Sequence, residues 1–539
     1  MLGSLGLCIA TIAIATAAQL SAFHIQDDAY MYARYADNLL HDGRVAWNHG
    51  GSPAYGASSL LYLVPLVVLR AMLPDSPALA LALGSLLCGG AALVSIVVLA
   101  WRASDAGTKA HLPIALLVIL PIAGAGEFFA THMGNGMDTC EAMLALAILL
   151  LAWTGYQRSP TRGRVWVLGV CGGLVYLARP ELALFALIVP FVVAVLSRGE
   201  ERKRAAEIFA ISALAIGAEL GLAYAYFGEA LPLSFYMKSS WRHAYGESFR
   251  ARYVGVGFDH LRNFLTSYWI WFALIAAGVV FEFRSFARNG GALRVAVLAA
   301  TVADFTYHTF FVTQIVGYAQ RFYYPTLPAL AMLAAWSAVA ISKPFVAYFA
   351  ERPLPYSRPV QLMFALVAAK LMAPPLVSAV RRAVEDEAGG KLATFDVHRR
   401  VETQSARFWY ALERISALPD EIVIATTEVG HPAALNPRKM IVDIAGLNEP
   451  EFALDGFSAD RLFGQLKPDV VYMPHPDYAP IVAQMRAYPT FAAEYREFTA
   501  EELDAYMGIA VRRNSAHYDE LCNAIEQTRV GTVAALPVH

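Results

Sequence analysis

The chain has 539 residues and a formal net charge of −2; 57% of its residues are hydrophobic and 16% are charged. Soluble domains carry about 25% charged residues, so this composition excludes an ordinary soluble protein and indicates a membrane protein with several spans. The near-neutral charge gives no electrostatic basis for nucleic-acid binding. The five cysteines are scattered, without metal-ligand or disulfide-framework spacing.

Twelve apolar stretches follow one another over the first 380 residues. They cover residues 2–23, 59–73, 78–100, 112–130, 140–157, 165–178, 182–197, 205–227, 263–283, 295–316, 322–342 and 359–380. A spanning helix needs about 20 residues, so we expect 59–73 to be a juxtamembrane or re-entrant piece. The others predict an α-helical polytopic membrane protein with about eleven transmembrane helices. The stretch 2–23 has no basic residue before it and no cleavage site of the kind that ends a signal peptide. We therefore interpret it as a retained span.

Lysine and arginine residues concentrate in five of the connecting loops. These loops are 101–111, 158–164, 198–204, 284–294 and 343–358. Short cytoplasmic loops are enriched in basic residues, so we expect all five loops and the N-terminus to lie in the cytoplasm. The chain is then expected to divide into a membrane domain, 1–380, and an extracytoplasmic domain, 381–539. An outer loop over 24–77 is expected to carry juxtamembrane helices.

The C-terminal region has the pattern of a small α/β domain. A helical pattern covers residues 395–418. Strand-like runs occupy residues 421–427, 440–446, 469–473 and 506–513. Neither a GxGxxG motif nor a P-loop is present in the sequence. This argues against a soluble nucleotide-sugar or ATP as a donor.

The first outer loop begins with two adjacent aspartates, Asp27 and Asp28. Carboxylates are costly in hydrocarbon, so we expect the pair at the membrane surface. One acid can act there as a general base, while the other can orient substrate or share a divalent cation. In the structural alternative, Asp27 is the N-cap of an amphipathic helix over 28–40. The tyrosines of that helix are expected at the half-wet interface: Tyr30, Tyr32 and Tyr35.

Further charged residues stand on the other expected outer loops. They are Asp138, Glu141, Arg179, Glu181, Lys238 and Arg321. We expect them to meet the aspartate pair in one site over the helix ends. Arginine binds phosphate through two parallel bonds and lysine binds it as a point charge, so cations beside acids suit a lipid-linked phosphate donor. The structural alternatives are a capped helix start, an interfacial ion pair and snorkelling to lipid headgroups.

The order of several short motifs resembles a known family. The motifs are DDAY with RYADNLL from residue 27, GMD at 136–138, ARPEL at 178–182, LPLSFYMK at 231–238, QRFYYPTLPAL at 320–330 and IVDIAGLNEP at 441–450. This order looks like the integral-membrane GT-C glycosyltransferases. It is most similar to the branch that includes the mycobacterial terminal β-(1→2)-arabinofuranosyltransferase. The resemblance extends over most of the chain, including the C-terminal domain.

The resemblance implies an inverting enzyme with a polyprenyl-phosphate sugar donor. It implies Asp27 or Asp28 as the catalytic base, and we slightly prefer Asp27. The implied substrate-binding residues are Asn48, Asp138, Arg179, Glu181, Lys238, Arg321, Asp443 and Asn448; from their positions beside these motifs, we also expect Tyr30 and Glu141 in the substrate site. The chain departs from the family pattern in two places, since Asp138 replaces a glutamate and no acid stands near Tyr55.

The sequence thus predicts a multi-pass glycosyltransferase of a bacterial cytoplasmic membrane, with its active site and C-terminal domain outside. Its expected partners are a polyprenyl-phosphate-linked sugar, membrane lipid, and a glycan, lipid or protein acceptor of the cell envelope. No cofactor is required by the sequence; a divalent cation at Asp27 and Asp28 is left open, and the histidines form no spaced ligand set. The alternatives are a transporter or flippase for a lipid-linked substrate and a non-catalytic envelope scaffold. Transporters often place ionisable groups near the midplane in two related halves, a pattern that we do not see in the sequence.

Overall fold

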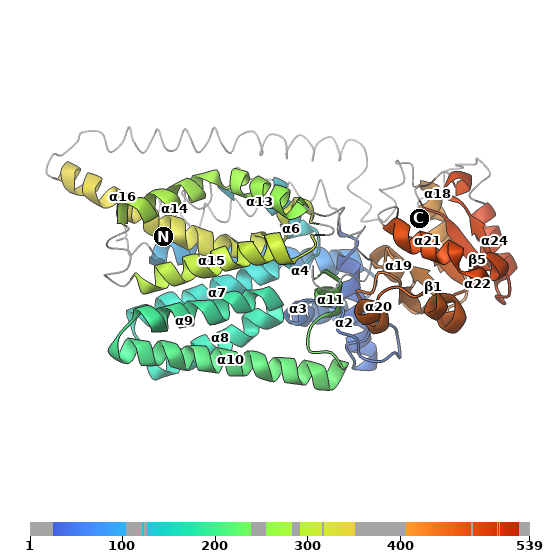
Figure 1. Cartoon of the computed structure of the whole chain (residues 1–539), viewed down its shortest axis with the longest axis horizontal. Coiled ribbons are helices and arrows are strands. Elements are labelled where there is room, and N and C mark those ends of the chain that lie inside the picture. The colour runs from blue at the N-terminus through green and yellow to red at the C-terminus, as the bar shows by residue number, and fades with distance from the viewer. Residues whose placement is uncertain are drawn as a thin grey trace.

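In the computed structural model, a bundle of long helices carries a mixed α/β domain at one end (Figure 1). The structure describes residues 25–103, 121–122, 127–238, 255–282, 291–314, 317–350, 406–475, 478–503, 505 and 507–527. The long helices are α4 (Pro77–Ala103), α7 (Thr139–Arg158), α8 (Arg162–Ala178), α9 (Ala183–Leu196), α10 (Gly199–Phe227), α14 (Trp269–Glu282), α15 (Ala292–Phe311) and α16 (Leu327–Ala350). Their buried leucine, alanine and aromatic side chains form a continuous core. The molecule is a mostly helical, multi-pass membrane protein, as the apolar stretches predict.

The number of spans is lower in the described residues than the sequence predicts. Four helical segments are long and apolar enough to cross a bilayer: α4, α7, α10 and residues 324–341. A fifth is added if α13 (Val256–Ser267) and α14 together form one bent span. The expected spans 2–23 and 359–380, and most of 112–130, lie outside the described residues. The predicted total of about eleven is therefore not confirmed.

The stretch 263–283 is not the single straight span that the sequence predicts. The chain bends by 83° between α13 and α14. α13 carries Asp259, His260 and Arg262 within its first two turns. Charged groups of this kind are costly in hydrocarbon, so α13 suits the membrane surface, whereas the apolar α14 suits its interior.

Two shorter helices, α2 (Ala29–Asp42) and α3 (Leu60–Met72), lie at the end of the bundle that faces the C-terminal domain (Figure 1). The 13 residues of α3 rise about 20 Å, too little to cross a bilayer, which agrees with the expected juxtamembrane piece. α2 ends at Gly43, whose φ of 65° is the left-handed conformation that favours glycine. The N-cap of α2 is Asp28, without a side-chain cap hydrogen bond, so the interpretation of Asp27 as N-cap is wrong.

A five-stranded sheet forms the centre of the C-terminal domain, with the strand order β2-β1-β3-β5-β4. The strands are β1 (Ile424–Thr426), β2 (Ile441–Asp443), β3 (Val470–Tyr472), β4 (Tyr495–Phe498) and β5 (Ile509–Arg512). The first three are parallel, and β5 runs antiparallel to both β3 and β4. Four strands coincide with predicted runs. The sequence did not predict β4, because its central residues Arg496 and Glu497 are charged.

Helices cover both faces of this sheet. They include α18 (Ala406–Ser416), α19 (Gly430–Leu435), α20 (Pro450–Asp455), α21 (Ala479–Ala487), α22 (Pro489–Glu494), α23 (Ala500–Leu503) and α24 (Tyr518–Glu526). Successive strand residues point to opposite faces, so Val471 packs with α20 and α21, whereas Val470 packs with α18 and α24. α18 lies within the predicted helix 395–418, of which residues 395–405 are outside the described part.

α2 is enclosed between the bundle and the C-terminal domain. It contacts α3 and α4 on the membrane side and α19 on the other. Its tyrosines are therefore buried, at 5% exposure or less, and are not half-wet as predicted: Tyr30, Tyr32 and Tyr35. Arg34 joins the two parts, since its guanidinium donates to the backbone carbonyls of Asn436 at 2.9 Å and Lys439 at 2.8 Å. The sheet domain is thus fixed against the helix that follows the aspartate pair.

Candidate active site

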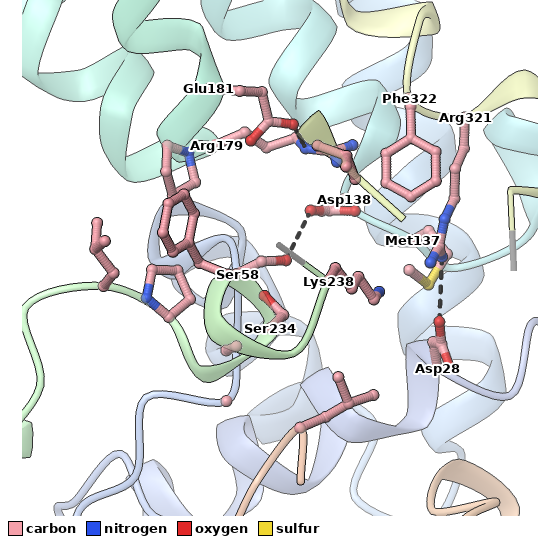
Figure 2. Close-up of a pocket in the computed structure, with 18 of the residues that line it drawn as sticks. Asp28, Ser58, Met137, Asp138, Arg179, Glu181, Ser234, Lys238, Arg321 and Phe322 are labelled. Atoms are coloured by element: carbon pink, nitrogen blue, oxygen red, sulfur yellow. Dashed lines mark hydrogen bonds and ion pairs between the residues drawn. The ribbon is translucent and has the colours of Figure 1, made fainter. Parts of the chain in front are cut away.

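A cavity of about 310 Å³ lies where the starts of α2 and α7, the end of α8 and the short helix α11 (Leu233–Lys238) meet. The charged residues around it come from distant parts of the chain (Figure 2): Asp28, Asp138, Arg179, Glu181, Lys238 and Arg321. Apolar side chains such as Leu184, Phe235 and Val312 complete the wall. The cavity therefore offers acids, cations and an apolar surface to one ligand.

Asp28 and Arg321 form an ion pair at the edge of the cavity, with an Oδ2–Nη1 distance of 3.2 Å (Figure 2). Arg321 lies in a turn between the 3₁₀ helices η3 (Tyr318–Gln320) and η4 (Tyr324–Thr326). Its guanidinium lies 5.3 Å from the centre of the Phe322 ring. Because ion pairing and the ring fix this guanidinium beside the carboxylate, the two groups can act on the same substrate.

Arg179 and Glu181 form a second pair, with an Nε–Oε1 distance of 2.7 Å. α8 ends before Arg179 because Pro180 disfavours a helical conformation at the residue preceding it. Both side chains are nearly buried and both line the cavity. The ion pair that the sequence analysis gave as the structural alternative is therefore present, and it also forms part of the cavity wall.

Asp138 reaches the cavity from the residue before α7. Gly136, with a φ of 78°, makes the turn that directs the chain into this helix. The Ser58 hydroxyl lies 3.5 Å from Asp138 Oδ2 and 2.8 Å from the Tyr32 hydroxyl. Glu141, one turn later, instead accepts a hydrogen bond from Ser59 at 3.0 Å and does not line the cavity. Only the first of the two acids therefore lines the cavity.

Lys238 is the last residue of α11, and Figure 2 shows its side chain in the middle of the cavity. The backbone carbonyl of Lys238 accepts a hydrogen bond from Thr313 N–H at 2.7 Å, which anchors the helix end. Burial, followed by the nearby Arg321 guanidinium, lowers the pKa of Lys238 to about 8. Within the described residues its Nζ has no hydrogen-bond or ion-pair partner. An anionic ligand would therefore offset both the loss of hydration and the repulsion by Arg321.

Asp27 faces away from the cavity, although it adjoins Asp28. Its carboxylate accepts hydrogen bonds from the backbone N–H groups of Gly430 at 3.0 Å and His431 at 2.7 Å, and contacts the His431 imidazole. Burial alone would raise the pKa of Asp27, but the His431 ring and the two N–H groups lower it below its usual value. The two aspartates thus have different partners in the structure.

Four other predicted site residues lie at the interface with the C-terminal domain and do not line the cavity: Tyr30, Asn48, Asp443 and Asn448. Tyr30 packs against the His431 ring. Asn48 accepts a hydrogen bond from the backbone N–H of Ile441 at 2.8 Å. Asp443 accepts 2.8 Å hydrogen bonds from both the backbone and the side chain of Asn448, while burial raises the pKa of Asp443 to about 7. A substrate-binding role of these four residues therefore stays a prediction.

Some residues in or beside the cavity were not predicted from the sequence. Ser58 and Phe322 line the cavity. Phe322 follows Arg321 within the QRFYYPTLPAL motif, and that proximity could have indicated it, whereas Ser58 adjoins none of the quoted motifs. His431 lies 404 residues from its partner Asp27, and no local pattern connects the two. Among the described residues, no group of three or more His, Cys, Asp or Glu side chains could hold a metal ion. The divalent cation left open by the sequence stays untested.

No protein-family model matches the chain, and neither does any curated protein sequence. Solved structures do match. ArnT from Cupriavidus metallidurans bound to undecaprenyl phosphate aligns with a TM-score of 0.55 and 14% identity, over 95% of this chain and 98% of that one. The archaeal oligosaccharyltransferase AglB from Archaeoglobus fulgidus, in complex with an inhibitory peptide and a dolichol-phosphate, aligns with a TM-score of 0.51 and 13% identity. That alignment covers 95% of this chain and 74% of the AglB chain. The chain therefore shares the GT-C fold over most of its length, while the arabinofuranosyltransferase branch is not shown.

Proposed function

We propose that the chain is an inverting glycosyltransferase that moves a sugar from a polyprenyl-phosphate donor to an extracytoplasmic acceptor. The observation that carries this proposal is the cavity in which Asp28, Lys238 and Arg321 meet beside an apolar wall. A carboxylate can accept a proton, cations can hold a phosphate, and apolar surface can hold a lipid tail. The shared fold supports the proposal, because both matched structures hold a polyprenyl-type phosphate.

Asp28 is the proposed general base. The acceptor hydroxyl gives its proton to Asp28 as its oxygen bonds to the anomeric carbon, and the bond from that carbon to the lipid phosphate breaks. The electron pair leaves with the phosphate, so a single displacement inverts the centre. We prefer Asp28 to Asp27, which the sequence analysis slightly favoured, because two N–H groups and an imidazole already occupy the Asp27 carboxylate.

Lys238 and Arg321 are the proposed phosphate ligands, assisted by Arg179. Negative charge grows on the lipid phosphate as the sugar departs, and fixed cations stabilise that charge most strongly where water is excluded. Lys238 suits this role because its side chain lines the cavity and has no anionic partner among the described residues. Asp138 and Glu181, which also line the cavity, are proposed to bind sugar or acceptor hydroxyl groups.

The finer assignments follow from the motif order. The proposed site of action is the outer face of a bacterial cytoplasmic membrane, and the acceptor is a glycan, lipid or protein of the cell envelope. Arabinofuranosyl transfer is the most specific activity that the motifs support. Figure 1 places the C-terminal domain beside α2 and α11, and we propose that it shapes the acceptor side of the cleft.

The test is a transfer assay with the full chain in proteoliposomes. Donors would be polyprenyl phosphates that carry different sugars, and the readout would be release of free polyprenyl phosphate that depends on added acceptor. Asp28→Asn is expected to remove turnover. Asp259→Asn is the matched control, since Asp259 is exposed on α13 and outside the cavity. Equal turnover in the two variants would exclude Asp28 as the base, and flipping of the donor without sugar transfer would indicate a transporter.

A further inference from the structure

A second cavity, of about 710 Å³, lies at the opposite end of the helical bundle. Four arginines line it: Arg102, Arg158, Arg204 and Arg294. α7 connects the two cavities, because Asp138 precedes its first residue and Arg158 is its last. The 20 residues of α7 rise about 30 Å, which is the thickness of a hydrocarbon core. The two cavities therefore lie near opposite surfaces of the membrane.

Each of these arginines comes from a different loop that the sequence places in the cytoplasm. Arg102 belongs to 101–111, and the others belong to 158–164, 198–204 and 284–294. The tendency of cytoplasmic loops to be basic requires positive charge in each loop, but it does not require the charges to converge. Convergence of four guanidinium groups on one cavity is thus an additional property of the fold.

Local contacts hold the arginines at the cavity wall. Arg158 donates to the backbone carbonyl of Arg102 at 3.1 Å, which ties the end of α7 to the end of α4. Arg204 donates to the carbonyl of Pro160. The Arg294 guanidinium lies 5.5 Å from the centre of the Trp336 ring, and that ring is buried. A guanidinium has five N–H donors, so one carbonyl uses only part of the capacity of Arg158 or Arg204.

The balance of charge around the cavity favours an anionic ligand. Among the described residues, Glu200 and Glu201 are the acids that line it, against four arginines. Glu200 forms an exposed pair with Lys203 at 3.0 Å, and that lysine lies outside the cavity lining. The lining thus has an excess of two positive charges, in a concave site where several planar donor groups can surround one phosphate.

We propose that this second cavity binds the phosphate headgroup of an anionic phospholipid from the leaflet opposite the candidate active site. A lipid is the source favoured over free phosphate because the neighbouring bundle surface is apolar, with Trp166 on α8 54% exposed and Leu196 on α9 46% exposed. Such side chains suit acyl chains. Basic pockets between transmembrane helices on the cytoplasmic side suit anionic lipid heads.

The experiment measures lipid binding to the purified full chain in detergent by native mass spectrometry. Phosphatidylglycerol, cardiolipin and phosphatidylcholine would be titrated separately, with inorganic phosphate as competitor. The wild type is expected to bind the two anionic lipids in preference to phosphatidylcholine. R158Q/R204Q is expected to weaken that binding about thirtyfold, since each basic residue contributes about fivefold to the attraction of an anionic lipid. The control R262Q/R438Q removes two exposed arginines outside the cavity and is expected to bind as the wild type does.

A second variant keeps the test independent of folding defects. E200Q/E201Q removes two exposed acids of the lining, so anionic lipid is expected to bind about threefold or more tightly. Equal binding of phosphatidylglycerol and phosphatidylcholine would overturn the proposal, as would unchanged binding in both cavity variants. Displacement of the lipid by inorganic phosphate at comparable concentration would overturn the choice of a lipid as the source.

Discussion

Asp27 and Asp28 are neighbours in the sequence, yet they belong to two different regions of the molecule. On the C-terminal side, Asp27 meets two backbone N–H groups and an imidazole of α19, so its carboxylate is satisfied. On the cavity side, Asp28 meets one guanidinium, and Lys238 nearby has no partner among the described residues. A satisfied polar interface stabilises one arrangement, whereas unsatisfied charge around a cavity is available to a ligand.

This comparison shows that two adjacent acids need not have the same function. Gly430 allows the close approach on the interface side, because a Cβ there would collide with the backbone carbonyl of Asp27. The interface holds the start of α2 in place, and that position presents Asp28 to the cavity. Substitutions at the interface and in the cavity are therefore expected to have different effects, on docking of the C-terminal domain and on turnover respectively.

The largest expected effect is on turnover in the cavity. Asp28→Asn is expected to lower kcat by about 10²- to 10⁴-fold, the usual contribution of a general base, with little change in stability. Asp27→Asn is expected to lower it less than tenfold. Parallel measurement of kcat and thermal unfolding for both variants checks the contrast. A larger loss of kcat in Asp27→Asn than in Asp28→Asn would reverse the assignment of the two acids.

The next effect is on docking of the C-terminal domain. Arg34→Met leaves at least two buried carbonyls of 436–439 without their donor, which costs about 3 kcal/mol or more. We expect faster proteolytic release of a fragment that contains the sheet domain. Arg262→Met, at an exposed position on α13, is the control. Equal proteolysis of the two variants would show that Arg34 does not hold the interface.

Acid is expected to weaken the same interface through Asp27. Its folded pKa is lowered, so its contribution to stability is complete above the unfolded pKa of about 3.9 and is lost as pH falls through the folded value. Proteolytic release should therefore rise in the wild type below about pH 4. Asp27→Asn should show a smaller acid-dependent change. An identical pH profile in both proteins would contradict the role of this carboxylate.

The smallest expected effect is a pH dependence of donor binding. The pKa of Lys238 is lowered to about 8, so its positive charge is present below that pH and is lost above it. The affinity for polyprenyl phosphate should therefore fall between pH 7 and pH 9, by up to about tenfold per pH unit beyond the pKa. Lys238→Arg keeps its charge over this range and should flatten the profile. Titration of both proteins with polyprenyl phosphate in detergent provides the measurement.

The residues of the cavity were more accessible to sequence reasoning than those of the interface. Arg179, Lys238 and Arg321 each follow or precede a span, and sidedness alone places them on a common surface. The contact of Asp27 with His431 joins residues 404 positions apart through two loops with no periodic pattern. The tyrosines of α2 were misplaced for the same reason, because the domain that buries them is remote in the chain.

The sequence by itself determined the helical membrane domain, the α/β domain and four of its five strands, because hydropathy and strand periodicity are local properties. It also identified the charged loop residues that line one cavity. Only the tertiary structure decided which acid faces the cavity, that the chain bends between α13 and α14, and that four loop arginines converge at the far end of the bundle. Those features depend on which distant surfaces pack together, and packing is not encoded in any single stretch of sequence.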